Sequence, residues 1–421
     1  MLSLDISGKS KKIMKINPIL FFWMLLFFPF VQPVYFSRIP SVNSLFNYWL
    51  VFSFFVILIM RIKFKKMSLP AMLTIFFVLT IVLSTVIAHP SEINRAFSYA
   101  LTNIGLYLFI DYMLKKDTRL AINVLMTTFE LLIYANLLTV IFFPSGLYIT
   151  IQETGWSSNM SWLLGLRNSI PSWIITGICI CMIYYFYTNN KLRSILFISG
   201  VFLTLALINI NFSLYSTSKS TPAGIIVSFV VILIYFLIPS KIKTSGFISL
   251  GKAMLMNLII FIGLVFFRLQ SLFSNLIAQQ LLKNETLTGR DAMWERALHA
   301  ISQHPILGYG IEPQLMMAQR LGNIAAVTTT HNTFLDIIYR GGLLSTIIFF
   351  ILIIVICKKA NTHKKDKIAF MISYMIAIYF FTGQTEGFSG SRMFILLAIA
   401  ANIPLLVNCI SEARKNEGIE T

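Results

Sequence analysis

Two residues of one long polar stretch, Arg290 and His331, are of types that could carry chemistry. Arg290 belongs to the segment TGRD (288–291), a capping-box signature that opens a helix, so we expect it in the first helical turn. Free backbone N–H groups there favour an anion, and a guanidinium adds bidentate recognition of phosphate. His331 follows a threonine-rich segment, and imidazole exchanges protons near neutral pH, which suits a general base for an alcohol. A solvated arginine and a structural histidine remain open readings of these local patterns.

Three further charged residues are weighed for the same site. Lys219 stands in a Ser/Thr-rich turn (NFSLYSTSKST, 211–221), where a lysine that snorkels to the membrane interface is the simpler reading. Arg167 stands in a second polar segment, 144–169. Glu130 falls in the middle of an apolar run, where a carboxylate is costly unless paired. A functional role and a structural hydrogen bond are equally open for Glu130, and it is left out of the predicted site.

The elements around Arg290 and His331 can be predicted from the same stretch. Apolar residues recur at helical spacing after Asp291 and stop before Pro305, which predicts one amphipathic helix. Asp336 and Arg340 are four residues apart on a second expected helix, where they would pair, and Gly341-Gly342 should break the chain. Arg290 and His331 are 41 positions apart, about 60 Å as one continuous helix, so the stretch must fold back for them to meet. The residues of the predicted apolar face are Met293, Trp294, Ala297, Leu298 and Ile301.

Composition identifies the kind of protein that holds these residues. Of 421 residues, 57% are hydrophobic and only 12% charged, whereas soluble domains are about 25% charged, so an ordinary cytosolic enzyme is excluded. The predicted class is an all-α polytopic membrane protein of about twelve transmembrane helices, read as a single domain, 1–421. All four cysteines lie in or beside apolar segments, so neither disulfides nor a zinc site is expected. The twelve apolar runs lie near 18–36, 44–60, 69–88, 97–114, 120–143, 170–188, 194–210, 222–239, 250–267, 341–357, 367–382 and 393–410.

The net charge of +18 indicates the orientation of the chain in the membrane rather than a nucleic-acid partner. With the N-terminus in the cytoplasm and the runs alternating, 23 of the 34 Lys and Arg residues fall inside and 11 outside. Both termini are therefore predicted to be cytoplasmic, with an uncleaved first span. Six of the outer cations fall in 268–340, which is expected to form one large outer helical loop.

These motifs resemble a known family. The stretches TGRDAMWERALHAISQHPILGYG (288–310) and TTTHNTFLDIIYRGGL (328–343) are similar to the O-antigen ligase and O-antigen polymerase superfamily. The shared pattern is Gly-Arg, Trp, His-Pro-x-x-Gly-x-Gly, His-Asn-x-Phe-Leu and a Gly-Gly turn. The segment STSKSTPAG resembles the family's Ser-Arg element with Lys219 in place of arginine, and GLRNS (165–169) matches a further outer-loop element.

The resemblance implies a glycosyltransferase of the GT-C type at the outer face of the bacterial cytoplasmic membrane. Its donor and acceptor would be glycans on undecaprenyl pyrophosphate, with flippase and chain-length regulator proteins as candidate partners. Polymerisation of repeat units is the leading reading, the O-antigen ligase reaction is the alternative, and a polyprenyl-glycan flippase is the alternative from another class.

The roles that the resemblance implies fall on four residues of this chain. His331 would be the catalytic base, and Arg290, Lys219 and Arg167 would bind pyrophosphate. Lysine at position 219 keeps the charge but loses the bidentate fork, for which Arg167 could compensate. The reaction would invert the anomeric centre and need neither a metal nor another cofactor.

Overall fold

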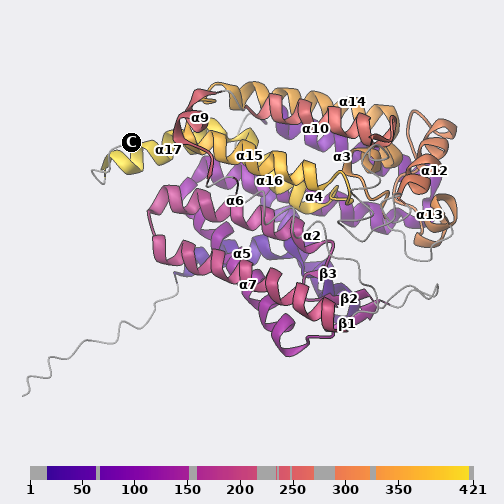
Figure 1. Ribbon diagram of the computed structural model, residues 1–421, viewed down its shortest axis with the longest axis horizontal. Helices are drawn as coiled ribbons and strands as arrows, with labels where there is room; N and C mark the ends of the chain where they lie inside the picture. Colours follow the sequence, from indigo (N-terminus) through magenta and orange to yellow (C-terminus); the bar gives the residue numbers. More distant parts are fainter. Residues whose placement is uncertain are drawn as a thin grey trace, which may run out of the picture.

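The computed structural model describes residues 17–62, 67–150, 159–215, 234, 237–246, 249–269, 290–322 and 329–416, and it is mostly helical (Figure 1). The first half contains α1 (Pro18–Phe27), two 3-10 turns (Phe28–Val31 and Val34–Arg38), α2 (Pro40–Ile62), α3 (Leu69–Ala88), a 3-10 turn (Pro90–Glu92), α4 (Ile93–Lys116), α5 (Thr118–Phe142), α6 (Ile170–Thr188) and α7 (Lys191–Tyr215). The second half contains α9 (Ser240–Ser245), α10 (Leu250–Val265), α12 (Arg290–Gln303), α13 (Gln314–Leu321), α14 (Thr333–Asn361), α15 (Lys367–Thr382), α16 (Ser391–Ala401) and α17 (Ile403–Asn416).

Within the described residues, six helices are long and apolar enough to cross a membrane: α2, α3, α5, α6, α7 and α14. A seventh span results if α16 and α17, which meet at 63°, are counted as one broken crossing. Eleven of the twelve predicted apolar runs lie on helical segments, and the run at 222–239 falls largely outside the described residues. Twelve crossings therefore remain a prediction.

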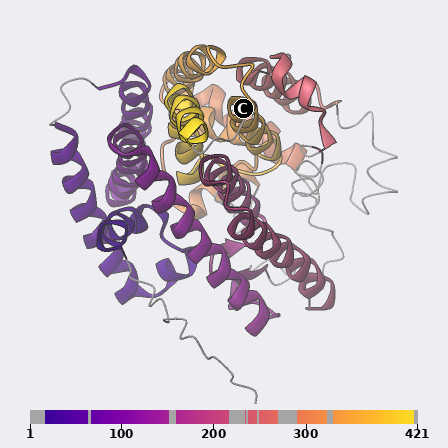
Figure 2. The same ribbon diagram turned by 90° about the vertical axis from the view of Figure 1, so that its left-hand side faces the viewer.

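The packing of the helices is typical of a protein surrounded by lipid. α4 contacts α2, α3, α5 and α16, and its inner turns are almost wholly buried. α2, in contrast, is buried on one side only. Phe52, Phe55 and Ile59 are exposed along one face, while Leu50 and Ile57 are buried in the bundle. Such a continuous apolar outer face is unfavourable in water and favourable against lipid tails. In the end-on view the early helices, drawn in indigo, lie on one side of the bundle (Figure 2).

Charged residues gather at the two ends of the bundle. α12, α13 and the small sheet lie at one end, which we call the site end, and α9 and the C-terminus lie at the other (Figure 1). At the far end Asp111 is buried and pairs with Arg61 and Lys115, which are 3.5 Å and 2.7 Å away. Within the described residues, α9 and α17 therefore lie at the opposite end of the molecule from α12 and α13, and the sidedness that the charge count predicts remains a prediction.

Glu130 has a partner. Its Oε1 accepts a hydrogen bond of 2.9 Å from Nε of Arg193, and the same guanidinium contacts Thr127 and Tyr184. The ion pair ties α5 to α7 and compensates the cost of a carboxylate within an apolar helix. This contact supports the structural reading of Glu130.

The expectation of an all-α protein is wrong in one detail. The segment between α5 and α6 forms a three-stranded antiparallel sheet, β1 (Tyr148–Thr150), β2 (Asn159–Trp162) and β3 (Gly165–Leu166), in the order β1-β2-β3. The buried Trp162 indole donates to the Phe143 carbonyl at 2.9 Å, and Leu164 N–H donates to Asn136 Oδ1 at 2.9 Å. Strand pairing satisfies the backbone of a segment that packs over the end of α5. Strands of two to four residues are too short for their alternation to be recognised in sequence.

Candidate active site

Arg290 is the first residue of α12, as its motif predicts. The helix buries Met293, Trp294 and Ala297 on one face and ends at Gln303, before Pro305. Thr288 and Gly289, the capping residues of the motif, lie outside the described residues. The predicted helix and its apolar face are confirmed, and α12 packs against α13 and α14.

Gly341 and Gly342 interrupt α14 and create the surface on which the preceding loop docks. Gly342 has φ +59° and ψ −161°, a conformation that favours glycine, and the helix kinks there before continuing to Asn361. The kink frees backbone groups, and the loop 305–310 pairs with them. Tyr309 and Gly310 donate to the carbonyls of Tyr339 and Arg340 at 2.9 and 2.7 Å, while Leu343 and Leu344 donate to those of Pro305 and Ile306 at 2.8 and 3.1 Å. The two glycine motifs therefore form one backbone clasp, which folds the stretch back on itself.

The segment that carries His331 is fixed on both sides. The Trp294 indole of α12 donates to the Thr330 carbonyl at 3.0 Å, and the Asn332 side chain caps α14 by accepting from Leu335 N–H at 3.1 Å. His331 itself has φ +52°, which is uncommon for a residue with a side chain. A side chain held in this region by surrounding contacts is typical of functional positions.

Asp336 supports the same segment. Its Oδ1 accepts from Thr330 N–H at 3.3 Å, and its Oδ2 accepts from Arg340 Nε at 2.9 Å. The predicted pairing of Asp336 with Arg340 is confirmed. The carboxylate is fully buried, so it links the start of α14 to the loop before it.

A loop between α15 and α16 completes the site. Thr333 N–H donates to the Gly383 carbonyl at 2.7 Å, and the Thr333 hydroxyl donates to the Glu386 carbonyl at 3.1 Å. Asn332 Nδ2 donates to the Gln384 carbonyl at 2.9 Å. These contacts hold residues 383–388 against the start of α14 and place the Glu386 side chain beside His331.

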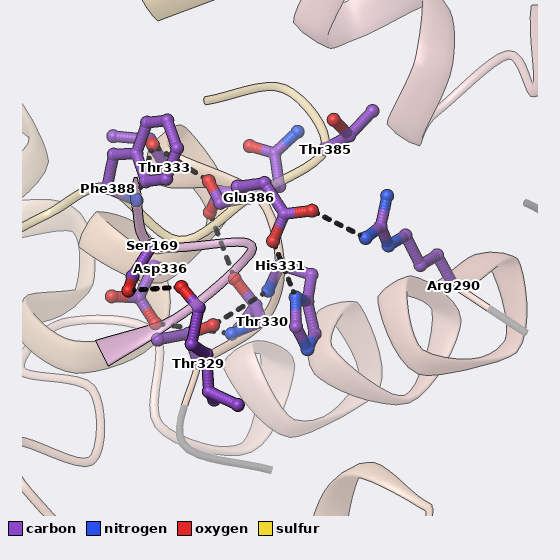
Figure 3. A network of polar contacts seen from close by, with 12 residues as sticks. Ser169, Arg290, Thr329, Thr330, His331, Thr333, Asp336, Thr385, Glu386 and Phe388 are labelled. Atoms are coloured by element: carbon purple, nitrogen blue, oxygen red, sulfur yellow. Dashed lines mark hydrogen bonds and ion pairs between the residues drawn. The ribbon is translucent and has the colours of Figure 1, made fainter. Parts of the chain in front are cut away.

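The Glu386 carboxylate joins the two predicted residues (Figure 3). Its Oε1 is 2.8 Å from Nη2 of Arg290, and its Oε2 is 3.3 Å from Nδ1 of His331. The side chains of Glu386 and Arg290 are 10% and 15% exposed, while that of His331 is 31% exposed. Burial raises the pKa of Glu386, but the charge of Arg290 and the contact with His331 outweigh it and hold this pKa below its ordinary value. The site is thus a carboxylate held between a guanidinium and an imidazole that reaches solvent.

Arg167 lies within electrostatic range of this group. It follows β3, and its guanidinium carbon is 3.5 Å from the centre of the Phe212 ring. Burial lowers the pKa of Arg167 to about 10, and the charge of Glu386 acts in the opposite direction. Arg167 therefore keeps its charge at neutral pH. Lys219, the remaining predicted cation, lies outside the described residues.

Glu386 is not among the residues predicted for the site, although the sequence holds a signal for it. It is the only acidic residue between Asp366 and Glu412, and it stands in a Gly/Ser/Thr-rich turn (TGQTEGFSGSR, 382–392) between two apolar runs. A lone carboxylate at the end of an apolar run, on the side where the charge count also puts Arg290 and His331, is a candidate partner for a site cation. Among the residues that the structure describes, no group of three or more His, Cys, Asp or Glu side chains is placed to hold a metal.

Comparison with known proteins agrees with the motifs. Residues 210–350 match the family model described as O-antigen ligase. A search of the curated proteins finds no match to the chain. The matched region includes α12, the backbone clasp and His331, whereas Glu386 and Arg167 lie outside it. The apolar helices and this match together indicate a multi-pass membrane protein, and the match over residues 210–350 is consistent with the O-antigen polymerase and ligase superfamily.

Proposed function

We propose that this protein is a membrane glycosyltransferase that polymerises undecaprenyl-pyrophosphate-linked repeat units into a surface polysaccharide. The observation that carries the proposal is the Glu386 carboxylate held between Arg290 and His331, because this arrangement supplies a base and a phosphate-binding cation together. The family match supports an O-antigen polymerase or ligase kind of activity. The site would face the outer side of the cytoplasmic membrane, where the charge count puts these loops.

His331 would act as the general base. With Nδ1 facing Glu386, the tautomer that donates to the carboxylate leaves Nε2 to accept a proton. The acceptor hydroxyl oxygen forms a bond to the anomeric carbon of the donor, and its proton passes to Nε2. A positioned base of this kind contributes about 10²–10⁴-fold to rate. Glu386 fixes the ring and stabilises the imidazolium that forms, so it is a positioning residue.

Arg290 and Arg167 would bind the leaving group. As the bond between the anomeric carbon and oxygen breaks, the electron pair stays on the pyrophosphate, and fixed cations stabilise that growing charge. A guanidinium has five N–H donors, and the hydrogen bond from Arg290 to Glu386 uses one nitrogen, Nη2. Displacement from the opposite face inverts the anomeric centre. Lys219 would add a further cation by the family resemblance.

One reconstitution distinguishes polymerase from ligase and from transporter. Purified protein is incubated with lipid-linked repeat units alone, and products are separated by length. A ladder of products supports the polymerase. Product that forms only after lipid A-core or another acceptor is added supports the ligase instead. If His331→Ala leaves polymer synthesis intact at normal protein level, the proposed catalytic role of His331 is refuted. A transport function gains support if the wild-type protein forms no product with or without an added acceptor.

A further inference from the structure

A second polar pocket lies beside the candidate active site and is not used by the chemistry above. It is lined by residues from the start of α4, the segment before α13, α13 itself and the first turns of α14, and its cavity volume is about 60 Å³. A water molecule needs roughly 10–15 Å³ measured in the same way, so the pocket has room for several water molecules or for the hydroxyl-bearing edge of a sugar. The lining residues are Arg95, Gly310, Glu312, Gln314, Met317, Tyr339 and Arg340.

Glu312 is the centre of this pocket. The residue is 5% exposed, and its Oε1 accepts a hydrogen bond from the Tyr339 hydroxyl. Its Oε2 lies 3.4 Å from Arg320 and 3.6 Å from His89, but within the described part of the chain no donor makes a hydrogen bond to it. A buried carboxylate oxygen without a hydrogen bond is costly, so this atom can gain from a donor that a ligand brings.

The charges around the pocket balance in pairs. Arg320 lies against Glu312 at 3.4 Å. Arg95 pairs with Glu92 at 2.7 Å, and Arg340 pairs with Asp336 at 2.9 Å. Burial lowers the pKa of His89 although the charge of Glu312 opposes the shift, so His89 is neutral at pH 7. This pocket therefore offers many hydrogen-bonding groups and no excess positive charge, which suits an uncharged polyhydroxyl group better than a phosphate.

The position of the pocket suits the binding of an acceptor glycan. Asp336 pairs with Arg340 of the pocket and also accepts from Thr330, the residue before His331. Thr333 and Arg340 are seven residues apart on α14, about 10 Å along the helix, which is close to the length of two sugar rings. In Figure 3, Arg290 lies on one side of His331 and Asp336 on the other. A direct displacement places the acceptor opposite the leaving group, so the acceptor belongs on the side of Asp336.

We propose that this pocket, centred on Glu312, binds a neutral sugar of the acceptor glycan next to the sugar whose hydroxyl reacts at His331. The inference rests on the proposed function, since it divides one active site into a cationic part for pyrophosphate and a charge-balanced part for sugar. Glu312 would accept from a sugar hydroxyl, while Arg95 and Gln314 at the rim would donate to others. Specificity for the acceptor would then reside in residues that touch no phosphate.

Binding without turnover tests the proposal. The full-length protein is titrated with two probes: the repeat-unit oligosaccharide released from its lipid, and undecaprenyl pyrophosphate without sugar. The variants are Glu312→Gln, which keeps the shape of the side chain, and Gln314→Ala at the exposed rim, which spares the buried cluster. Glu295→Gln, an exposed carboxylate on α12 at 68% exposure, is the matched control. Melting temperature is recorded for each variant.

The proposal predicts an increase of about tenfold in the oligosaccharide Kd for Glu312→Gln and a smaller increase for Gln314→Ala. Undecaprenyl pyrophosphate should bind both variants as it binds the control. An unchanged oligosaccharide Kd in both variants, or displacement of the oligosaccharide by inorganic pyrophosphate, would overturn it. His331→Ala should bind the oligosaccharide normally but form no polymer. If that variant still forms polymer, the catalytic role of His331 falls; if the wild-type protein forms neither polymer nor ligase product, the proposed function falls, and in both cases the binding result for the pocket stands by itself.

Discussion

Replacing Glu386 with glutamine tests the coupling at the centre of the site. The amide keeps the size and hydrogen-bonding ability of the side chain but removes the charge that stabilises the imidazolium of His331. At the observed 3.3 Å, a unit-charge pair is worth about 1 kcal/mol in water and about 5 kcal/mol at an effective dielectric constant of 20. Because Glu386 is 10% exposed and His331 31%, an intermediate value of about 3 kcal/mol applies. Since each 1.36 kcal/mol is tenfold in rate, kcat should fall by about 100-fold.

The assay is steady-state polymer formation from lipid-linked repeat units, with kcat and KM separated and melting temperature recorded. Glu386→Asp keeps the charge on a shorter side chain, so its kcat should be about tenfold higher than that of Glu386→Gln. KM for the acceptor should change little in either variant. The proposed charge coupling between Glu386 and His331 is refuted if Glu386→Gln retains its kcat, or if Glu386→Asp is as slow as Glu386→Gln although both variants melt at the wild-type temperature.

Three other changes test separate parts of the account. Arg290→Lys keeps the charge but loses the guanidinium fork, so KM for the pyrophosphate donor should rise about tenfold while the oligosaccharide Kd stays constant. Gly342→Ala forces a side chain into φ +59° and against the Ile306 carbonyl, and it should lower the free energy of unfolding by about 2 kcal/mol, as measured by denaturation. Gly251→Ala, where the nearest atom to a new Cβ is 3.7 Å away, should be neutral by comparison. The lowered pKa of Glu386 means that its ion pairs stabilise the fold above the ordinary glutamate value of about 4.3, and that this stabilisation is lost as pH falls through the folded value. Melting temperatures from pH 7 to pH 3 should show an acid-side loss that is smaller in Glu386→Gln.

Much of the fold could be predicted from local pattern. Apolar runs place eleven helical segments because a membrane helix is specified by its own composition. Helix α12, its buried face and the pairing of Asp336 with Arg340 follow from spacing of three and four residues within one helix. Arg290 and His331 carry recognisable motifs, and the structure brings both to one carboxylate.

The remaining features depend on contacts between segments distant in sequence. Glu386 comes from a loop 55 residues after His331 and is held there by backbone contacts with Thr333 that leave no periodic signal. The pair Gly341-Gly342 predicts a break in the helix, but it does not predict that the loop 305–310 pairs with the freed backbone groups. Glu312 likewise becomes notable only when α3, α13 and α14 place His89, Arg320 and Tyr339 around it.

Whether this site transfers glycosyl groups can be measured by the release of undecaprenyl pyrophosphate from purified protein supplied with lipid-linked repeat units. Wild-type protein should release one molecule for each glycosidic bond formed. His331→Ala should release none above background, while His299→Ala, at an exposed histidine on α12, should match the wild type. Polymer formation by His331→Ala at the wild-type rate, with the same yield of undecaprenyl pyrophosphate, would contradict the assignment of this site to glycosyl transfer.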